Sequence, residues 1–387
     1  MQRSVYLDHA ATTPVRPEVL AAMLPYFTKN FGNPSSVHAF GRESRIAIDK
    51  ARGSIAQSIN ADAREIVFTS GGTEADNMAV QGVAMAKIAK GRHIVTSAVE
   101  HHAVLDSCDY LAKQGWDVTF LPVDEFGRIS LADLEAAIRP DTVLISLIHG
   151  NNEVGTMQPV AEVGELARRK GIVFHVDAVQ TVGTIPVDVK ALKVDLLSFS
   201  AHKFYGPKGI GALYIRKGTP IKPLVHGGGQ ERKYRPGTEN HAAIIGMARA
   251  LEFALEHMDE NVARITRLRD NLISGLLEIP EVKLNGHPTQ RLPGNVNIGV
   301  RYVEGESLVL SLDMKGVAAS SGSACTSGAL DPSHVLLAMG MSHEIAHGSL
   351  RLTLGIDNTA DDIDYVLSIM PAIVDRLRRM SPLYNEK

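Results

Sequence analysis

Seven short apolar runs that recur between helical stretches are the feature that most constrains the fold of this chain. The runs are rich in β-branched residues, and several are apolar throughout, which is typical of strands covered on both faces. Strand and helix alternate across this region, so the sequence predicts an α/β fold with a mostly parallel, seven-stranded sheet. The expected strands are 64–70, 93–98, 117–123, 142–150, 172–179, 195–201 and 211–216.

The pattern changes after the last of these runs. A long helical stretch covers about 241–279, followed by the strand-like runs VNIGVRY and KGVAAS and by an amphipathic helix that begins after Thr359. A chain of 387 residues, 44% of them hydrophobic, is long enough to bury two cores. We therefore expect a large domain of residues 16–259. Residues 1–15 and 260–387 are expected to form a smaller α+β domain.

Charge and composition exclude several classes of protein. The formal net charge is -3 and acidic and basic residues are mixed, so no basic block predicts nucleic-acid binding. No apolar run approaches the roughly 20 residues that span a bilayer, and the N-terminal residues lack the features of a signal peptide. With only 2 cysteines a disulfide framework is ruled out. We expect a cytoplasmic protein in which a free thiol persists.

Two strand ends carry side chains suited to a pyridoxal phosphate (PLP) site. Lys203 follows the run at 195–201, and Asp177 lies at the end of IVFHVD. Ligands of α/β sheets bind at the carboxyl ends of strands, where a partly desolvated lysine can act as an amine nucleophile. PLP sites need such a lysine and an acid that pairs with the protonated ring nitrogen. The alternatives are a solvated surface lysine and an acid that caps a helix.

A third strand end offers a seat for an anion. In VFTSGGTEADNMAV a strand-like run passes through Gly72 and Thr73 into a helix. Free N–H groups at a helix N-terminus and the Thr73 hydroxyl suit a phosphate, although the same residues can form a plain turn. The stretch is neither a Walker loop nor a GxGxxG fingerprint, which disfavours nucleotide binding.

Adjacent histidines, His101 and His102, follow another strand. Their side chains point in different directions, so a bidentate metal clamp is disfavoured. One imidazole can stack on a cofactor ring and serve in proton transfer, or it can simply begin a helix.

Cys325 lies in ASSGSACTSGAL, where nothing can pack around its thiol. An exposed free thiol is a liability that soluble proteins avoid, so its presence here favours a reactive cysteine. We expect a mobile loop at about 321–330, with Asp331 and Pro332 beginning the next helix. Cys108, by contrast, lies at helical spacing among leucines and is expected in the core.

Taken in order, the motifs resemble the class V aminotransferase branch of fold-type I PLP enzymes, and within it the NifS/IscS cysteine desulfurases. The resemblance covers nearly the whole chain. It rests on YLDHAATTP, FGNPSSVHAFG, TSGGTEADN, EHHAV, HGNNEVGTMQP, HVDAVQ, SAHKFYGPKGIGALYIR, RPGTEN, SSGSACTSG and AHGSLRLTLG.

This resemblance implies a role for each candidate site residue. Lys203 would bind PLP covalently, and His101 would stack over the ring. Asp177 would hold the pyridinium nitrogen, and Gln180 would hydrogen-bond the ring hydroxyl. Thr238 would reach the phosphate of the neighbouring subunit's cofactor, which implies a homodimer. The residues expected at a subunit's own phosphate are Gly72, Thr73, Ser200 and His202.

The substrate carboxylate would be held by Asn152 and Arg351, since an arginine fork suits that group. From the residues alone, Arg351 can also be an edge-strand arginine, Asn152 a turn residue and Ser200 an ordinary strand-end hydroxyl. The substrate implied by the resemblance is L-cysteine, and the products are L-alanine and a persulfide on Cys325.

Delivery of that sulfur is expected to need a partner. Cys325 would swing out and pass the persulfide to an iron–sulfur scaffold protein of the IscU/NifU type, and could transiently ligate iron on that partner. Rival interpretations are a transaminase or a selenocysteine lyase of the same fold, and a regulatory module without catalysis. A transaminase has no use for Cys325, and the presence of Lys203 argues against the module.

Overall fold

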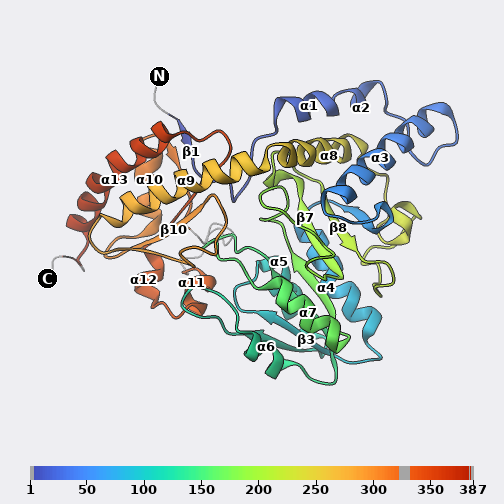
Figure 1. Ribbon diagram of the computed structural model, residues 1–387, viewed down its shortest axis with the longest axis horizontal. Coiled ribbons are helices and arrows are strands. Elements are labelled where there is room, and N and C mark those ends of the chain that lie inside the picture. The colour runs from blue at the N-terminus through green and yellow to red at the C-terminus, as the bar shows by residue number, and fades with distance from the viewer. Residues whose placement is uncertain (1–3, 322–331, 383, 385–387) are drawn as a thin grey trace.

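The larger of two lobes is built on one seven-stranded sheet (Figure 1). The computed structural model describes residues 4–321, 332–382 and 384. The sheet has the order β2-β8-β7-β6-β5-β3-β4, and β8 runs in the direction opposite to the other six strands. All seven predicted strands are confirmed. Their bounds are Ile66–Thr69 (β2), His93–Ser97 (β3), Asp117–Leu121 (β4), Thr142–Ile148 (β5), Val173–Asp177 (β6), Leu196–Ser200 (β7) and Gly211–Ile215 (β8).

Helices cover both faces of this sheet, which explains why the central strands are apolar throughout. One core joins Phe174 and Ile145 to the helices α3, α6, α7 and α8. The other joins Val173 and Leu144 to α4 and α5. Successive strand residues face opposite cores, as the period of two requires. The helix bounds are Ala39–Ser58 (α3), Gly72–Lys87 (α4), His102–Lys113 (α5), Leu131–Ala137 (α6), Val160–Lys170 (α7) and His241–Glu256 (α8).

A second, antiparallel sheet of order β12-β10-β9 lies in the other lobe. Its core is packed by α9, α10 and α13, and Val5 and Leu7 of the N-terminal segment join it. Figure 1 accordingly shows both chain ends at this lobe. The separate core supports the expected small domain, whose boundaries stay a prediction. The bounds are Val5–Tyr6 (β1), Val282–Leu284 (β9), Asn295–Val300 (β10), Val317–Ala318 (β11), Ser349–Thr353 (β12), Met258–Leu277 (α9), Gly305–Asp313 (α10) and Ala360–Met380 (α13).

Helix ends follow local signals in most places. Thr359 caps α13 in a capping box with Asp362, as predicted. The expected single stretch at 241–279 is two helices, because the chain turns at His257 between the two cores. The helix after the cysteine loop is α11 (His334–Ala338), which is followed by α12 (His343–His347). Its cap is Ser333, so the predicted start at Pro332 is wrong; Asp331 lies outside the described residues.

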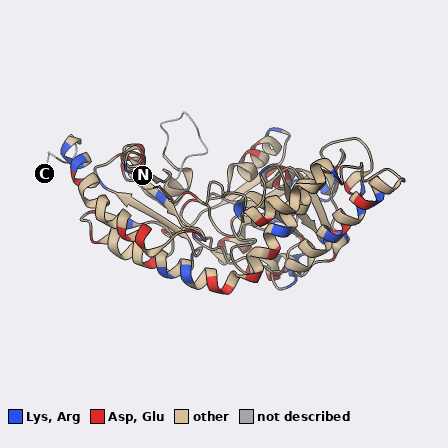
Figure 2. Ribbon diagram, turned by 90° about the horizontal axis from the view of Figure 1, so that it is seen from above, with Lys and Arg blue, Asp and Glu red and all other residues tan. Residues whose placement is uncertain are grey.

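Three N-terminal helices extend along the large lobe: α1 (Pro17–Met23), α2 (Pro25–Thr28) and the longer α3. Figure 2 shows acidic and basic residues mixed along the outer helices, in keeping with the small net charge. Among the described helices, none is both long enough and apolar enough to cross a bilayer.

Candidate active site

A cavity of about 290 Å³ lies where the strands β5, β6 and β7 end and α4 begins. Segments from the small lobe close it: Ala10 and Ala11 from the N-terminus and Arg351 from β12. Of the predicted site residues that the structure describes, all except Thr238 line this one cavity. They are Gly72, Thr73, His101, Asn152, Asp177, Gln180, Ser200, His202, Lys203 and Arg351.

Lys203 ends a short 3-10 turn, Ala201–Lys203, that directly follows β7. Its Nζ donates hydrogen bonds to the carbonyl oxygens of Ala10, at 2.6 Å, and Ala11, at 2.8 Å. Gln180 Nε2 donates to the same Ala10 oxygen at 3.0 Å. The N-terminal segment therefore forms a wall of carbonyl groups that orients both side chains within the cavity.

Asp177 is the last residue of β6, and it is buried. Its Oδ1 accepts the Val179 N–H at 2.9 Å, which fixes the carboxyl at the strand end. Burial raises the pKa of Asp177 to about 6. A cationic ring nitrogen would stabilise the ionised form of this carboxyl in the same place.

The anion seat at the start of α4 has a shape that requires glycine. A Cβ on Gly72 would lie 2.6 Å from Val179 Cγ2, so no side chain fits there without displacing the wall. Thr73 follows in the first helical turn, where N–H groups lack helical partners. Ser200 and His202 reach the seat from the end of β7. The Nδ1 of His202 lies 3.1 Å from Thr12 Oγ1.

His101 precedes α5 as its cap, and its Nδ1 accepts the Ala103 N–H at 3.1 Å. His101 therefore begins a helix, as one of the two interpretations expected, and its ring also lines the cavity. Burial lowers the pKa of His101 to about 4, and the nearby Lys203 acts in the same direction. A neutral imidazole with a proton on Nε2 results, which suits stacking on a ring.

Arg351 crosses from the small lobe into the cavity wall and is 4% exposed. It donates to Asp8 Oδ1 at 2.9 Å and to the carbonyl oxygen of Asn152 at 3.0 Å. The Asn152 carbonyl thus positions the arginine, while the turn itself is built by Asn151. The Asn151 Oδ1 accepts the N–H groups of Glu153 and Val154, each at 2.9 Å.

The segment that carries Cys325 leaves and re-enters the described structure beside this cavity. Ser320 exchanges two backbone hydrogen bonds with Arg351, at 3.1 and 2.7 Å. After the segment, His334 Nε2 donates to the carbonyl oxygen of Glu100 at 2.9 Å. Cys325 itself, its predicted mobility and its predicted role as an iron ligand fall outside the described residues.

Cys108 lies on α5 and is completely buried, as predicted. Burial raises the pKa of its thiol to about 12, so the thiolate that sulfur chemistry needs is not formed there at neutral pH. Among the described residues, no group of three or more His, Cys, Asp or Glu side chains could hold a metal ion.

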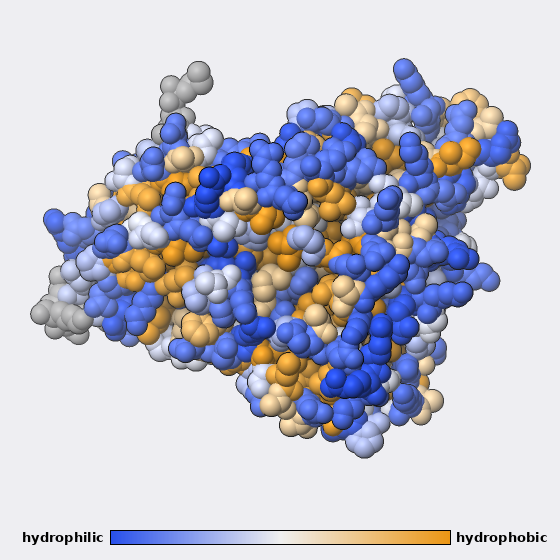
Figure 3. Space-filling view, viewed as in Figure 1, coloured by the Kyte–Doolittle hydropathy of each residue, from blue (hydrophilic) through white to orange (hydrophobic). Residues whose placement is uncertain are grey.

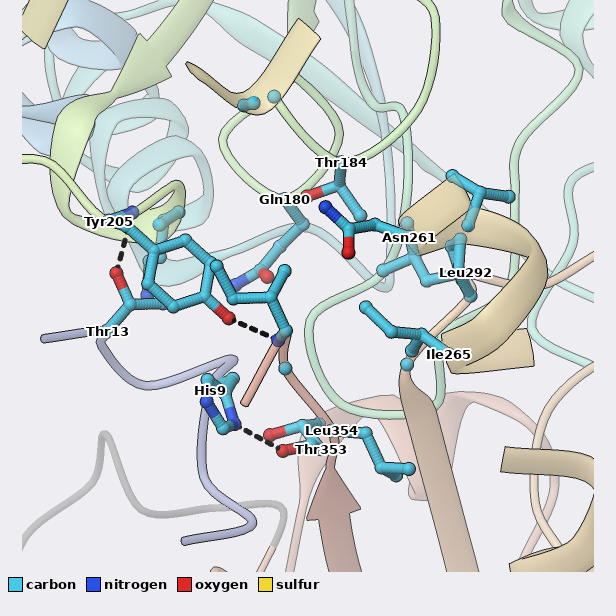
Figure 4. Close-up of a pocket in the computed structure, with 18 of the residues that line it drawn as sticks. His9, Thr13, Gln180, Thr184, Tyr205, Asn261, Ile265, Leu292, Thr353 and Leu354 are labelled. Carbon is cyan, nitrogen blue, oxygen red and sulfur yellow. Dashed lines mark hydrogen bonds between the residues drawn. The ribbon is translucent and has the colours of Figure 1, made fainter. Parts of the chain in front are cut away.

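A second cavity lies on the far side of the Ala10 wall and shares Lys203 and Gln180 with the first (Figure 4). It lies between the lobes, and Figure 4 shows Ile265, Leu292 and Leu354 around it. It lacks the anion seat and the buried acid of the first cavity. The cavity that contains Asp177 is therefore the candidate active site.

The first cavity fits PLP. Gly72 leaves room for a phosphate beside free helix N–H groups, and Asp177 is a buried acid in the cavity that could pair with a protonated ring nitrogen. Lys203 supplies the amine that the cofactor needs. Sequence reasoning missed the carbonyl wall at Ala10 and Ala11. It also missed Asp76, although a position one helical turn after Thr73 signals the same helix face.

Comparison with known proteins agrees with this site. The Aminotransferase class-V family matches residues 5–366. The cysteine desulfurase IscS of Methanosarcina thermophila is 57% identical over 98% of this chain and 94% of its own length. The cysteine desulfurase IscS of Dictyoglomus turgidum is 56% identical over 100% of this chain and 98% of its own.

A solved structure of a NifS-like protein superposes with a TM-score of 0.92, at 40% identity over 97% of this chain and 100% of the other. The fold predicted from the sequence, a fold-type I PLP-dependent transferase with a mostly parallel sheet, is thereby confirmed. The chain belongs to the class V aminotransferase family, and within it to the PLP-dependent cysteine desulfurases of the NifS/IscS type.

Proposed function

We propose that this chain takes sulfur from L-cysteine in the cavity around Lys203 and leaves it as a persulfide on Cys325. The observation that carries the proposal is the placement of the cysteine segment. One end is hydrogen-bonded to the cavity wall, at Ser320 to Arg351. The other end is hydrogen-bonded, through His334, to Glu100, the residue before the cavity-lining His101. The thiol is therefore tethered on both sides to the place where the substrate would bind.

The described residues divide the work of binding and proton transfer. Arg351 binds the substrate carboxylate through its guanidinium, with Asp8 holding the fork in place. PLP, when bound through Lys203, supplies an electron sink for the negative charge that develops at the substrate Cα. Asp177 keeps positive charge on the ring nitrogen. The Lys203 Nζ takes the Cα proton, and neutral His101 excludes water above the ring.

Sulfur transfer balances without an outside oxidant. The Cys325 thiolate attacks the substrate sulfur, so an S–S bond forms while the Cβ–S bond breaks. The electron pair of the broken bond stays on carbon, which takes up a proton and yields L-alanine. An ordinary cysteine has a pKa of about 8.5, so only a minor fraction is thiolate at neutral pH.

The test is incubation of the PLP-loaded protein with L-cysteine. We expect stoichiometric alanine and a persulfide on Cys325, detected by mass spectrometry. Cys325→Ser should keep the cofactor absorption band and lose alanine formation, whereas Cys108→Ala should keep both. Full alanine formation by Cys325→Ser would contradict the assignment, and pyruvate with a new amino acid would indicate a transaminase.

A homodimer that shares its sites is part of the proposal. Thr238 is exposed and does not line the cavity of its own chain, so a role at a phosphate requires a second subunit. Figure 3 shows apolar surface at the end of the molecule formed by α1–α3, where a partner could bury it. Exposed apolar side chains there are Leu20, Leu24, Phe27, Phe31, Val37 and Phe40.

Analytical ultracentrifugation and PLP titration test the shared site. The protein should sediment as a dimer, and Thr238→Val should weaken PLP binding by about tenfold, as expected for the loss of a charge-assisted hydrogen bond. Thr238→Ser should bind PLP like the natural chain. A monomer with unchanged PLP affinity would overturn this arrangement.

An iron–sulfur scaffold protein of the IscU/NifU type is the proposed persulfide acceptor. Its cysteines would take the outer sulfur from Cys325, and Cys325 would transiently ligate iron on the scaffold. Isotope-labelled sulfur is first loaded onto Cys325 from L-cysteine. In an assay under reducing conditions like those of the cytoplasm, this label should then move to the scaffold protein. Retention of all label on Cys325 would exclude this acceptor.

A further inference from the structure

A buried polar layer lies between α4 and the large sheet, directly under the cofactor cavity. Its members come from four elements: Asp76 from α4, Ser146 from β5, His175 from β6 and Ser198 from β7. Each is at most 1% exposed. Asp76 also lines the cavity itself, and none of these residues has a part in the reaction described above.

Both ring nitrogens of His175 are hydrogen-bonded to serine hydroxyl groups. Nδ1 lies 2.8 Å from Ser146 Oγ, and Nε2 lies 2.9 Å from Ser198 Oγ. A serine can donate to one nitrogen and accept from the other, which is the pattern of a neutral imidazole. Burial lowers the pKa of His175 to about 3. The 3.6 Å separation between His175 Nε2 and Asp76 Oδ1 is therefore not an ion pair.

Among the described residues, the groups that act on the Asp76 carboxyl include no cation. Its Oδ1 makes no hydrogen bond to any described residue, while Ser198 lies within hydrogen-bonding reach of the carboxyl. The charged groups that face it are acids: Asp177 and, further away, Glu100. Lys203 acts on Asp177 from across the cavity. Burial and the Asp177 charge both raise the pKa of Asp76 well above its ordinary value.

Asp177 and His175 lie two residues apart on β6 and thus face the same side of the sheet, toward Asp76. Ser198 is the register partner of Asp177 on β7. Two carboxylates cannot both ionise in so small a buried space at neutral pH, because like charges there repel strongly. One of the two acids must keep its proton.

We propose that Asp76 is a positioning residue of the cofactor site, a neutral carboxylic acid whose proton starts a donor chain through Ser198 and His175 to Ser146. Each member of the chain then donates one hydrogen bond to the next, and Asp177 is left as the sole anion under the ring nitrogen. The inference rests on the proposed role of Asp177 in holding that nitrogen.

The decisive substitution is Asp76→Asn, because an amide keeps the shape and the donor of a neutral acid but cannot ionise. Infrared spectra of the cofactor-free protein should contain the carbonyl band of protonated carboxyls at pH 7. The difference spectrum, natural chain minus Asp76→Asn, should contain the contribution of Asp76, because the contribution of buried Glu100, whose pKa is raised to about 8, cancels. A difference spectrum without this band would overturn the proposal, since Asp76 would then be ionised.

Stability measurements on the cofactor-free protein give a second, independent result. A pKa raised in the folded state means that stability is lost as pH rises from the unfolded value, about 3.9, toward the folded one. Asp76→Asn removes this loss, so its stability relative to the natural chain should increase between pH 4 and pH 7. If Asp76 were instead an anion paired with a cationic His175, Asp76→Asn would be destabilised across this range.

Cofactor binding tests the positioning role. Asp76→Ala leaves Ser198 without its donor and should weaken PLP binding by about tenfold, the scale of one hydrogen bond to a charged network. Asp76→Asn should restore the affinity. Equal losses in both variants would overturn the proposal. Because neither the infrared nor the stability result involves cysteine turnover, failure of the desulfurase assignment would be distinguishable.

Discussion

The two walls of the active-site cavity are built in different ways. On the large-lobe wall, Asp177, Ser200 and Lys203 stand at the ends of adjacent strands, and each is fixed by the backbone of one sheet. On the opposite wall, Arg351 is held by Asp8, Asn152 and Ser320, which belong to three separate segments. The first wall depends on one sheet, and the second on how the two lobes meet.

This difference suggests a division of labour. A cofactor that stays bound benefits from a rigid wall whose groups are oriented before it arrives. The substrate enters and leaves in each reaction cycle, and it is bound by Arg351 on the wall formed where the two lobes meet. Substitutions on the first wall should therefore act on PLP chemistry, and substitutions on the second on the affinity for L-cysteine.

The largest effect is expected for Lys203→Ala. Loss of the group that takes the Cα proton should slow alanine formation by about 10²–10⁴-fold. The matched control is Lys208→Ala, in the same loop, whose Nζ lies 3.4 Å from the Thr13 carbonyl oxygen and outside the cavity. Alanine release from L-cysteine measures both variants. Comparable losses of alanine formation in the two variants would contradict the assignment of Lys203 as the group that takes the Cα proton.

Arg351→Lys tests whether the second wall acts mainly on the affinity for L-cysteine. A lysine keeps the charge but cannot form the two-pronged bond to a carboxylate, which is worth about 1.5–3 kcal/mol. We expect KM for L-cysteine to rise about 10- to 100-fold with a smaller change in kcat. Asp8→Asn, which only loosens the fork, should show a weaker form of the same change. An effect on kcat alone would place Arg351 on the chemical step.

Gly72→Ala probes the anion seat. The added methyl group lies 2.6 Å from Val179 Cγ2, so overpacking should cost about 1–3 kcal/mol of stability and weaken PLP binding. Gly53→Ala is the control, because a Cβ there meets nothing within 4 Å in the middle of α3. It should stabilise the protein by about 0.5–1 kcal/mol. Chemical denaturation and PLP titration distinguish the two.

The last expected effect, small within any one pH unit, concerns the acid beneath the large-lobe wall. Burial raises the pKa of Glu100 to about 8 from its ordinary value of 4.5. The folded state therefore holds a proton that the unfolded state releases, and stability falls as pH rises between these values. Glu100→Gln should remove up to about 1 kcal/mol of this loss per pH unit. Parallel stability curves for both proteins from pH 5 to pH 8 would show that Glu100 is ionised when folded.

Local pattern explains why so much of the fold was predictable. Strands buried on both faces must be apolar along their length, so β2 to β8 stood out in the sequence. Thr359 predicted the start of α13, because its side chain accepts a hydrogen bond from the first turn of that helix. The predictions were less accurate where tertiary packing decided the local structure. His257 interrupts an otherwise helical stretch because α8 and α9 pack on different cores. Ser333 caps α11 by accepting the Leu336 N–H, and its hydroxyl donates to Glu153 of a distant segment.

By itself, the sequence determined the α/β fold, the strand ends that carry Asp177 and Lys203, and the membership of a PLP-dependent family. The strands and their ends follow from residue types and spacings within single segments, and the family follows from the resemblance of motifs along nearly the whole chain. Only the tertiary structure placed Asp8 on Arg351 and Asp76 beside Asp177. Such pairs join segments far apart in the chain, and whether a buried acid is charged depends on every neighbour that packing brings to it.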